Sequence, residues 1–352
     1  FFPNKIPNPD LKWERTGQFD IGLDLGLFNN RVRITTDYYK KKTTDLLYSV
    51  AVPATSGYQT MLKNIGSIEN QGYELSIESD NLTGPFSWTT AFNISFNRNK
   101  VLELGGEDYK EMAEGDGHIK TGSVRRLIAG EPIGVFYGYR FDGIFQNEEE
   151  CKQQTSSASP IGVGLRRYKD LNGDGKVDAA NDREILGDAN PKFFGGLTNT
   201  FAYKGFELNV FLQYSYGNKI LNYNAMELEN PTGGQNAYAD MVNRWTPENP
   251  SNIYPKATTN RAILASDRFI EDGSYLKLKT LSLSYSFPKI NMKHIQGLRL
   301  YVTGQNLLTW TKYRGYDPEV SYRGASTLEA GEDFGGYPQS RTFMFGVKLD
   351  IK

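Results

Sequence analysis

Cysteine and histidine are nearly absent from this chain of 352 residues. Its one cysteine, Cys151, has no partner for an intramolecular disulfide and excludes a Cys-based zinc site. The two histidines, His118 and His294, argue against a multi-histidine metal centre. A disulfide scaffold is excluded, and the common metal centres are not expected.

The chain also lacks an excess of charge and a long apolar run. Its 40 basic and 41 acidic side chains nearly cancel, so no net field directs it to nucleic acid or to an acidic partner. No run of some 18 apolar residues occurs, which excludes a transmembrane helix. A membrane β-barrel stays open, because alternating strands average out in hydropathy, here a mean of −0.54.

Aromatic residues and glycine are abundant instead. The chain holds 22 Tyr, 20 Phe and 4 Trp, together 13% of its residues, and 36 Gly. These residue types are enriched in β-rich proteins, and membrane barrels carry aromatic girdles at their two interfaces. Composition therefore favours an all-β fold.

The clearest pattern is a two-residue alternation between Phe19 and Tyr39. Apolar residues occupy alternate positions on both sides of an Asn29-Asn30 turn: Phe19, Ile21, Leu23, Leu25 and Leu27, then Val32, Ile34 and Tyr38. A period of two predicts strands, and the Asn-Asn turn predicts a tight hairpin. In a soluble sandwich the apolar face would be core. In an outer-membrane barrel it would meet lipid, and the polar face would line the lumen.

Similar alternation predicts eleven strands, at 13–27, 31–40, 70–78, 86–98, 119–128, 133–145, 193–203, 206–216, 275–287, 298–307 and 341–351. The alternating runs are roughly 9 to 13 residues long, which suits a tilted strand that crosses a bilayer. Strands of soluble sheets are typically about 5 to 6 residues long. Strand length favours the membrane.

The connections between these strands alternate between short and long. Short turns are predicted near 28–30, 79–85, 130–132, 204–205 and 288–297, and long polar loops near 41–69, 101–118, 146–192, 217–268 and 308–340. Outer-membrane barrels have short periplasmic turns and long extracellular loops, whereas structureless connections of about 40 residues are rare in soluble domains. The pattern predicts a transmembrane antiparallel β-barrel. Because eleven strands cannot close the usual even barrel, and Phe1 is an unusual start, we expect a missing N-terminal portion.

Several motifs, in order along the chain, carry a resemblance. They are Asn8-Pro-Asp-Leu-Lys-Trp-Glu14, the stretch Gly134 to Phe145, Asp170-Leu-Asn-Gly-Asp-Gly175, Asn190-Pro-Lys-Phe-Phe-Gly-Gly196, Gly273-Ser-Tyr-Leu-Lys-Leu-Lys279, Gly304-Gln-Asn-Leu307, Tyr316-Asp-Pro-Glu319 and Tyr337-Pro-Gln-Ser-Arg341. Together they resemble the C-terminal half of the barrel in SusC/RagA-type TonB-dependent transporters. The resemblance spans nearly all of residues 1–352.

The resemblance implies a 22-stranded barrel in the bacterial outer membrane, of which eleven strands would be half. It also implies a plug domain and a TonB-contacting segment, both outside this chain, and a SusD-like surface lipoprotein as a lid. Such pairs can form dimers. The implied activity is TonB-driven import of oligosaccharides or peptides. One departure is the last residue, because such barrels usually end in an aromatic and this chain ends Asp350-Ile351-Lys352.

Other function classes have less support. No Gly-x-Ser-x-Gly elbow occurs, and the acidic run Glu148-Glu149-Glu150 reads more simply as a solvated loop tip than as a glycosidase acid pair. We therefore do not expect an enzyme. Two alternatives stay open: a passive porin, and a soluble or surface glycan-binding β-sandwich.

One loop resembles a calcium-binding loop. Its pattern Asp-x-Asn-x-Asp-Gly would offer six ligands: Asp170, Asn172, Asp174, the Lys176 carbonyl, Asp178 and Asp182. The acidic ligand expected at position 12 is Asn181 here, and Asp182 follows it. The competing interpretation is a cluster of turns whose side chains bond their own backbone. If Ca²⁺ binds, we expect it to stiffen an extracellular loop.

Four residues are candidates for substrate contact. Tyr223, Trp245 and Tyr254 fall in a long predicted loop, where aromatic rings could stack on sugars or grip a peptide, although loop packing is the simpler and favoured interpretation. Arg140 is predicted to face the lumen, and so are Glu207, Lys277, Lys279 and Arg299.

Overall fold

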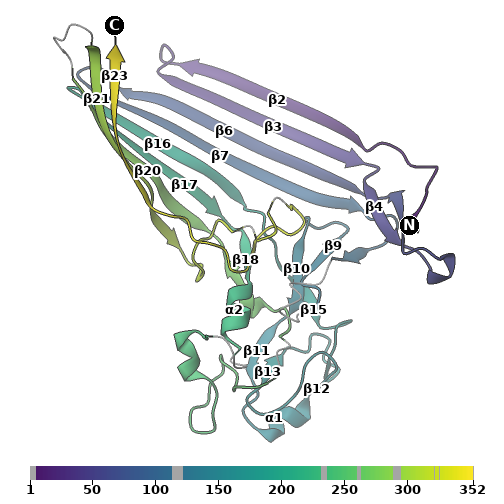
Figure 1. Cartoon of the computed structure of the whole chain (residues 1–352). Helices are drawn as coiled ribbons and strands as arrows, with labels where there is room; N and C mark the ends of the chain where they lie inside the picture. Colours follow the sequence, from purple (N-terminus) through teal and green to yellow (C-terminus); the bar gives the residue numbers. More distant parts are fainter. Residues whose placement is uncertain are drawn as a thin grey trace.

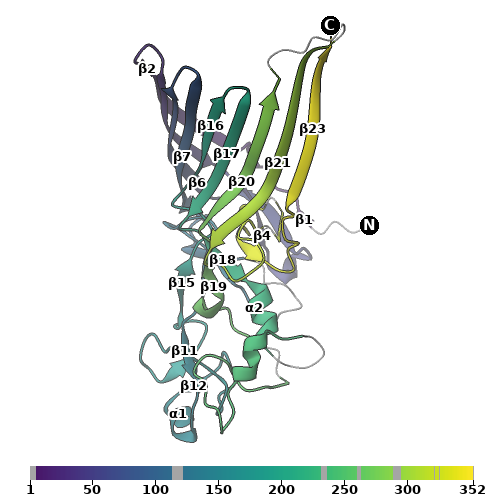
Figure 2. The same cartoon turned by 90° about the vertical axis from the view of Figure 1, so that its left-hand side faces the viewer.

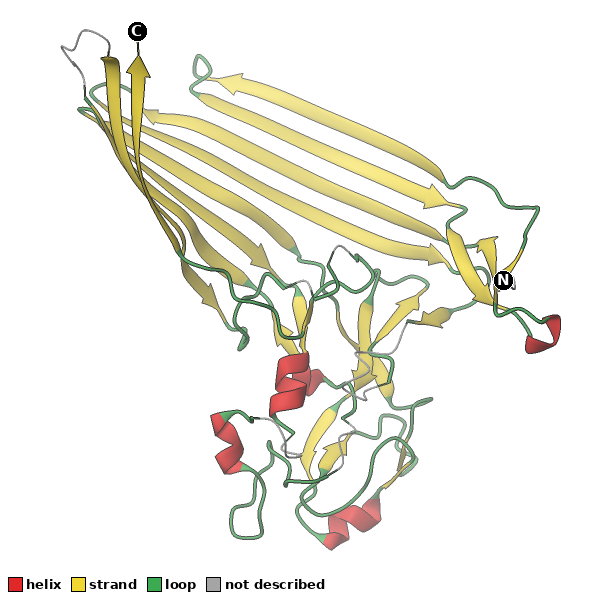
Figure 3. Cartoon of the chain, in the orientation of Figure 1, coloured by secondary structure: helices red, strands yellow, loops and turns green. Residues whose placement is uncertain are grey.

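A computed structural model describes residues 5–112, 122–230, 236–259, 263–287, 295–320, 322–324 and 326–351. Nearly all regular structure in these ranges is β (Figure 3). A wall of long strands occupies one end of the molecule, and short elements gather at the other end (Figure 1). None of the described helices is long and apolar enough to cross a membrane.

The wall is one antiparallel sheet with the strand order β2-β3-β6-β7-β16-β17-β20-β21-β23. Its strands are β2 (Arg15–Leu27), β3 (Val32–Thr44), β6 (Ser67–Leu82), β7 (Phe86–Glu103), β16 (Phe193–Tyr203), β17 (Phe206–Tyr216), β20 (Tyr275–Ser286), β21 (Ile295–Thr311) and β23 (Thr342–Ile351). They are 10 to 18 residues long, enough to cross a bilayer at a tilt. Figure 2 shows the sheet curving from β2 to β23.

The predicted hairpin between Phe19 and Tyr39 is confirmed. Residues of β2 and β3 pair from Arg15 with Thr44 to Leu27 with Val32. The turn residues Phe28, Asn29 and Asn30 all have positive φ, between 54° and 63°. Asparagine tolerates this left-handed conformation better than most residues, which explains the sharp reversal at this point.

The register gives the sheet two chemically distinct faces. One line of paired residues is apolar in eight consecutive strands: Leu25, Ile34, Ile77, Phe92, Leu197, Leu212, Leu278 and Leu308. The neighbouring line on the other face is Asp24, Thr35, Ser76, Asn93, Gly196, Gln213, Lys277 and Thr309. We assign the first face to lipid and the second to the lumen, as the alternation predicts.

An aromatic cluster lies near the short-turn end of the apolar face. Phe86 and Trp88 of β7 stack on Phe201 of β16, and Phe206 packs on Tyr285 with ring centres 4.5 Å apart. Amphipathic rings of this kind favour the boundary between hydrocarbon and headgroups. This cluster marks one membrane interface.

Two of the eleven predicted strands are not part of the sheet. The prediction for 119–128 and 133–145 is wrong because β7 pairs directly with β16, and residues 104–192 form one connection. Residues 113–121 lie outside the described ranges. Within this connection, β9 (Arg125–Ile128) and β10 (Val135–Tyr139) pair in a small sheet. Its consecutive residues Val135 and Phe136 are both fully buried, so β10 has no lipid-facing side.

The long connections fold into what we call the loop module. Its strands are β8 (Tyr109–Glu111), β9, β10, β11 (Phe141–Ile144), β12 (Thr155–Ser156), β13 (Arg166–Tyr168), β14 (Lys176–Val177), β15 (Arg183–Gly187), β18 (Lys219–Asn222), β19 (Ile270–Asp272) and β22 (Glu332–Asp333). Its helices are α1 (Glu148–Gln153), α2 (Tyr223–Leu228), η2 (Ala239–Asn243) and η3 (Asp267–Phe269). A separate small sheet of β1 (Lys5–Ile6), β5 (Thr60–Asn64) and β4 (Leu47–Ala51), with η1 (Ala54–Ser56), lies beside the start of the wall.

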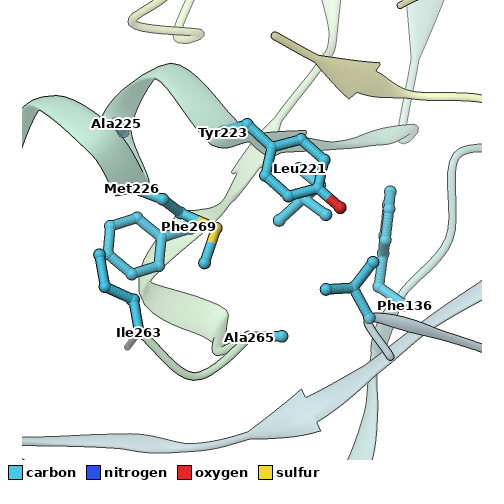
Figure 4. Close-up of a cluster of buried hydrophobic side chains, with 9 residues drawn as sticks. Phe136, Leu221, Tyr223, Ala225, Met226, Ile263, Ala265 and Phe269 are labelled. Carbon is cyan, nitrogen blue, oxygen red and sulfur yellow. The ribbon is translucent and has the colours of Figure 1, made fainter. Parts of the chain in front are cut away.

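The loop module has its own hydrophobic core, drawn in Figure 4. Its buried members come from the β7–β16 and β17–β20 connections: Val124, Phe136, Leu221, Tyr223, Ala225, Met226, Ile263, Ala265 and Phe269. Phe334 of a third connection, between β21 and β23, packs against them. Burial in this shared core therefore stabilises the contributing connections together.

The face assignment predicts unequal costs for two neighbouring substitutions on β23. Phe345→Arg places a charge on the lipid face and should destabilise the full-length protein by about 2–4 kcal/mol if it lies near the bilayer centre. Met344→Arg places the same charge on the lumen face and should cost much less. Urea unfolding in lipid vesicles measures both. Equal losses would contradict the assignment.

Candidate functional site

A group of charged side chains joins the wall to the β21–β23 connection at the loop end of the lumen face. The group consists of Lys277 and Lys279 on β20 and of Asp317 and Glu319 in the connection, and we call it the latch. Lys277 Nζ lies 2.6 Å from Asp317 and 2.5 Å from Glu319, and Lys279 Nζ lies 3.0 Å from Glu319. The Gln213 amide also donates to Glu319, at 3.1 Å.

Burial strengthens the ion pairs of the latch. Lys277 is only 2% exposed, so its charge depends on the two carboxylates. Burial raises the pKa of the Glu319 carboxyl, but hydrogen bonds from Lys277 and Lys279 outweigh it and hold that pKa below its ordinary value of 4.5. Glu319 is therefore ionised at neutral pH.

A cavity of about 460 Å³ lies beside the latch and is called the mouth cavity below. Its lining includes Asp317, Glu319, Tyr322, Asp333, Phe334 and Tyr337. Asp333 is itself buried and accepts a hydrogen bond from the Tyr313 hydroxyl. Aromatic rings next to fixed carboxylates can contact both the faces and the polar groups of a sugar or a peptide.

Buried ion pairs hold the loops around this cavity in place. Glu229, 1% exposed, accepts from Arg268 at 3.0 Å and from Arg314 at 2.8 Å. Arg125 pairs with Glu332 at 2.7 Å, and both side chains are buried. These pairs join segments as much as 207 residues apart, so the position of each loop depends on the others.

The four predicted substrate residues all lie in the loop module, and the structure does not bring them together at the mouth cavity. Tyr223 is fully buried in the core of Figure 4, where it packs and does not meet solvent. Trp245 donates to the Gln146 side chain, and Tyr254 donates to Asp240. Arg140 pairs with Glu184 and Asp267, so the expectation that it lines the barrel lumen is wrong.

The predicted calcium ligands lie close together in one loop, but their oxygens already accept backbone N–H groups. Asp170 accepts from Gly173 and Gly175, Asp178 from Ala180 and Asn181, and buried Asp182 from Leu171 and Asp178. Asn172, Asp174 and Lys176 complete the loop through Asx-type bonds. Over the described ranges, no three acidic, histidine or cysteine side chains converge as metal ligands. Calcium binding stays a prediction.

Sequence reasoning missed most of the mouth cavity. Lys277 and Lys279 were expected to face the lumen, but nothing paired them with Asp317 and Glu319, about 40 residues away. The sequence held a signal for these residues, because the two lysines fall in the motif Gly273 to Lys279 and the two carboxylates in the motif Tyr316 to Glu319.

Comparison with known proteins identifies the family. A family model described as "TonB dependent receptor-like, beta-barrel" matches residues 1–307. The chain belongs to this family. It is a stretch of an outer-membrane β-barrel, and its relatives are receptors and transporters, not enzymes.

Individual relatives are similar along almost the whole chain. TonB-dependent receptor P3 of Formosa agariphila is 41% identical over 97% of the chain, and TonB-dependent receptor SusC of Bacteroides thetaiotaomicron is 30% identical over 99%. The structure of the RagAB peptide transporter superposes on 98% of the chain with a TM-score of 0.78 and 27% identity. The chain spans about a third of these proteins, 34%, 33% and 36% respectively.

Family membership also decides one alternative. The soluble β-sandwich is ruled out, because TonB-dependent receptors are outer-membrane barrels and no second sheet covers the apolar face of the wall in the described structure. The resemblance to SusC/RagA-type transporters is confirmed.

The latch predicts a difference between two lysines. Lys277→Met leaves two carboxylates facing each other and should destabilise the loop end by about 3–5 kcal/mol. Lys279→Met removes a more exposed charge, and its cost should stay below about 1 kcal/mol. Hydrogen exchange at residues 312–320 of the full-length protein measures the effect. Equal exchange in both variants would contradict the latch.

The calcium prediction also has a direct test. If the loop binds Ca²⁺, calorimetry should show binding to the full-length protein, and Asp174→Ala should abolish it without loss of folding, because Asp174 is exposed. If the wild type shows no heat of binding, or if Asp174→Ala binds as the wild type does, the loop is a cluster of turns and not a calcium site.

Proposed function

We propose that this chain is part of an energised importer that takes nutrient molecules across the outer membrane with TonB. The observation that carries the proposal is the match along nearly the whole chain to TonB-dependent receptors and to the RagAB peptide transporter. The architecture supports it. A polar sheet face runs from the short turns to a loop end that carries an open cavity, which is the arrangement that a transport path needs.

We infer that the transported molecule is an oligosaccharide or a peptide. The mouth cavity supports this class, because Tyr322, Phe334 and Tyr337 offer rings, and Asp317 and Glu319 offer carboxylate oxygens. Sugars and peptides both present flat or apolar surfaces together with hydroxyl or amide donors. Among the similar proteins, RagAB is named a peptide transporter.

We also infer two protein partners. One is a SusD-like surface lipoprotein at the loop end, where Tyr316 and Tyr337 are 81% and 92% exposed and could contact it. The other is the TonB complex, reached through parts of the longer protein. Two such transporter–lipoprotein pairs could form a dimer.

Uptake measurements test this function. Deletion of the gene should abolish growth or uptake on one class within a panel of oligosaccharides and peptides, and the full-length gene should restore it. Loss of TonB should have the same effect as the deletion, because transport through a plugged barrel needs energy.

Two results would overturn the proposal. Uptake that persists without TonB would indicate a passive porin, the remaining alternative. Normal growth of the deletion strain on every member of both panels would exclude import of oligosaccharides and peptides.

A further inference from the structure

A small cavity in the loop module lies away from the latch and from the lumen face. Its volume is about 110 Å³, and it is enclosed by the segment 159–168, by Pro255 and Thr258, and by Asn230. The polar residues of its wall are Ser159, Arg166, Tyr168, Asn230 and Thr258. The space is large enough for a small polyatomic group.

Arg166 stands in this wall without a counter-ion. A guanidinium has five N–H donors. Only one hydrogen bond of the Arg166 side chain is formed within the described ranges, from Nη2 to the Glu229 carbonyl oxygen at 3.1 Å. No carboxylate of the described chain lies within ion-pair distance of Arg166. The Glu229 carboxylate pairs instead with Arg268 and Arg314.

The Arg166 side chain is partly buried, and the loss of part of its hydration is costly unless something compensates it. Burial lowers the pKa of Arg166, the direction expected when a cation loses water, and it outweighs the opposite effects of Tyr168 and Glu229. Among the described residues that line the cavity, Arg166 is the only one with a charged side chain. An anion in the cavity would supply the missing partner.

Other polar groups at the cavity can also donate to an anion. Asn230 is 6% exposed, and its Oδ1 is buried with no hydrogen-bond partner in the described structure. A rotation of its amide by 180° turns the NH₂ group to the position of that oxygen. Burial raises the pKa of the Tyr168 hydroxyl, which therefore keeps its proton.

We propose that this cavity binds a small oxyanion group, such as a carboxylate, a sulfate or a phosphate, through Arg166 and Asn230. Guanidinium groups pair with these anions through two parallel hydrogen bonds, and burial strengthens such bonds. The site would give the loop module a selectivity for anionic molecules that does not depend on the mouth cavity. The proposed site also does not depend on transport activity, so a binding measurement can test it without an uptake assay.

The adjacent arginine provides a matched control. Arg167 pairs with Asp142 at 3.0 Å and with Glu150 at 3.3 Å, and it is not part of the cavity wall. Arg166→Gln should therefore remove the site, whereas Arg167→Gln should leave it intact. Asn230→Asp provides a second variant, because its carboxylate would occupy the place of the anion beside Arg166.

The test is calorimetry on the full-length protein in detergent, at constant ionic strength, with sodium sulfate, phosphate, acetate and chloride as probes. We expect saturable binding of at least one oxyanion, and chloride should not replace it. Arg166→Gln and Asn230→Asp should each weaken binding by about tenfold or more, the effect of losing a charge-assisted hydrogen bond. The preferred probe distinguishes carboxylate, sulfate and phosphate.

Several outcomes would overturn the proposal. Absence of binding for all three oxyanions would mean that only water fills the cavity. Equal binding by wild type and Asn230→Asp would place any bound anion elsewhere, even if Arg166→Gln failed to fold. A loss in Arg167→Gln as large as that in Arg166→Gln would indicate a general effect of charge.

Discussion

The constraint on which this structure depends is that backbone polar groups must be paired wherever lipid surrounds the chain. A continuous ladder of long strands meets it, and the pleat then assigns successive residues to lipid and to lumen. One irregularity matters for the site. Between Leu278 and Thr280 the register with β17 shifts, so Lys279 is an extra residue in β20. This bulge keeps leucines on the lipid face on both sides of it. Lys277 and Lys279 both reach the Glu319 carboxylate.

The loop end obeys a different constraint, because it must stay ordered in water. Apolar side chains from several connections share one core, and buried ion pairs such as Arg125–Glu332 fix how the connections cross. A buried pair contributes little net stability compared with apolar packing, but a wrong partner would leave a charge unpaired. We therefore regard these pairs as determinants of a single loop arrangement around the mouth cavity, whereas the core supplies most of the stability.

The alternation of apolar and polar residues predicted the wall better than the loops. The hairpin around Asn29 and the lipid face follow from alternation, because there the environment repeats with the same period as the strand. The stretch 133–145 has the same alternation but folds in the loop module, and alternation does not report whether lipid or protein covers a side chain. The sequence did not predict the latch, because its lysines and carboxylates are about 40 residues apart along the chain. The motif beginning at Asp170 was found, but the structure shows its oxygens accepting backbone N–H groups.

The shared core has a mechanical consequence for a transporter. Phe136, Tyr223 and Phe334 come from three connections and meet at one core, so one connection cannot move far without opening the core of the others. The latch then ties this unit to β20 through Lys277. A molecule or partner that binds at the loop end therefore meets one cooperative body attached to the barrel wall. Any opening motion of the loops must either break the buried Lys277 pairs or carry the whole module with it.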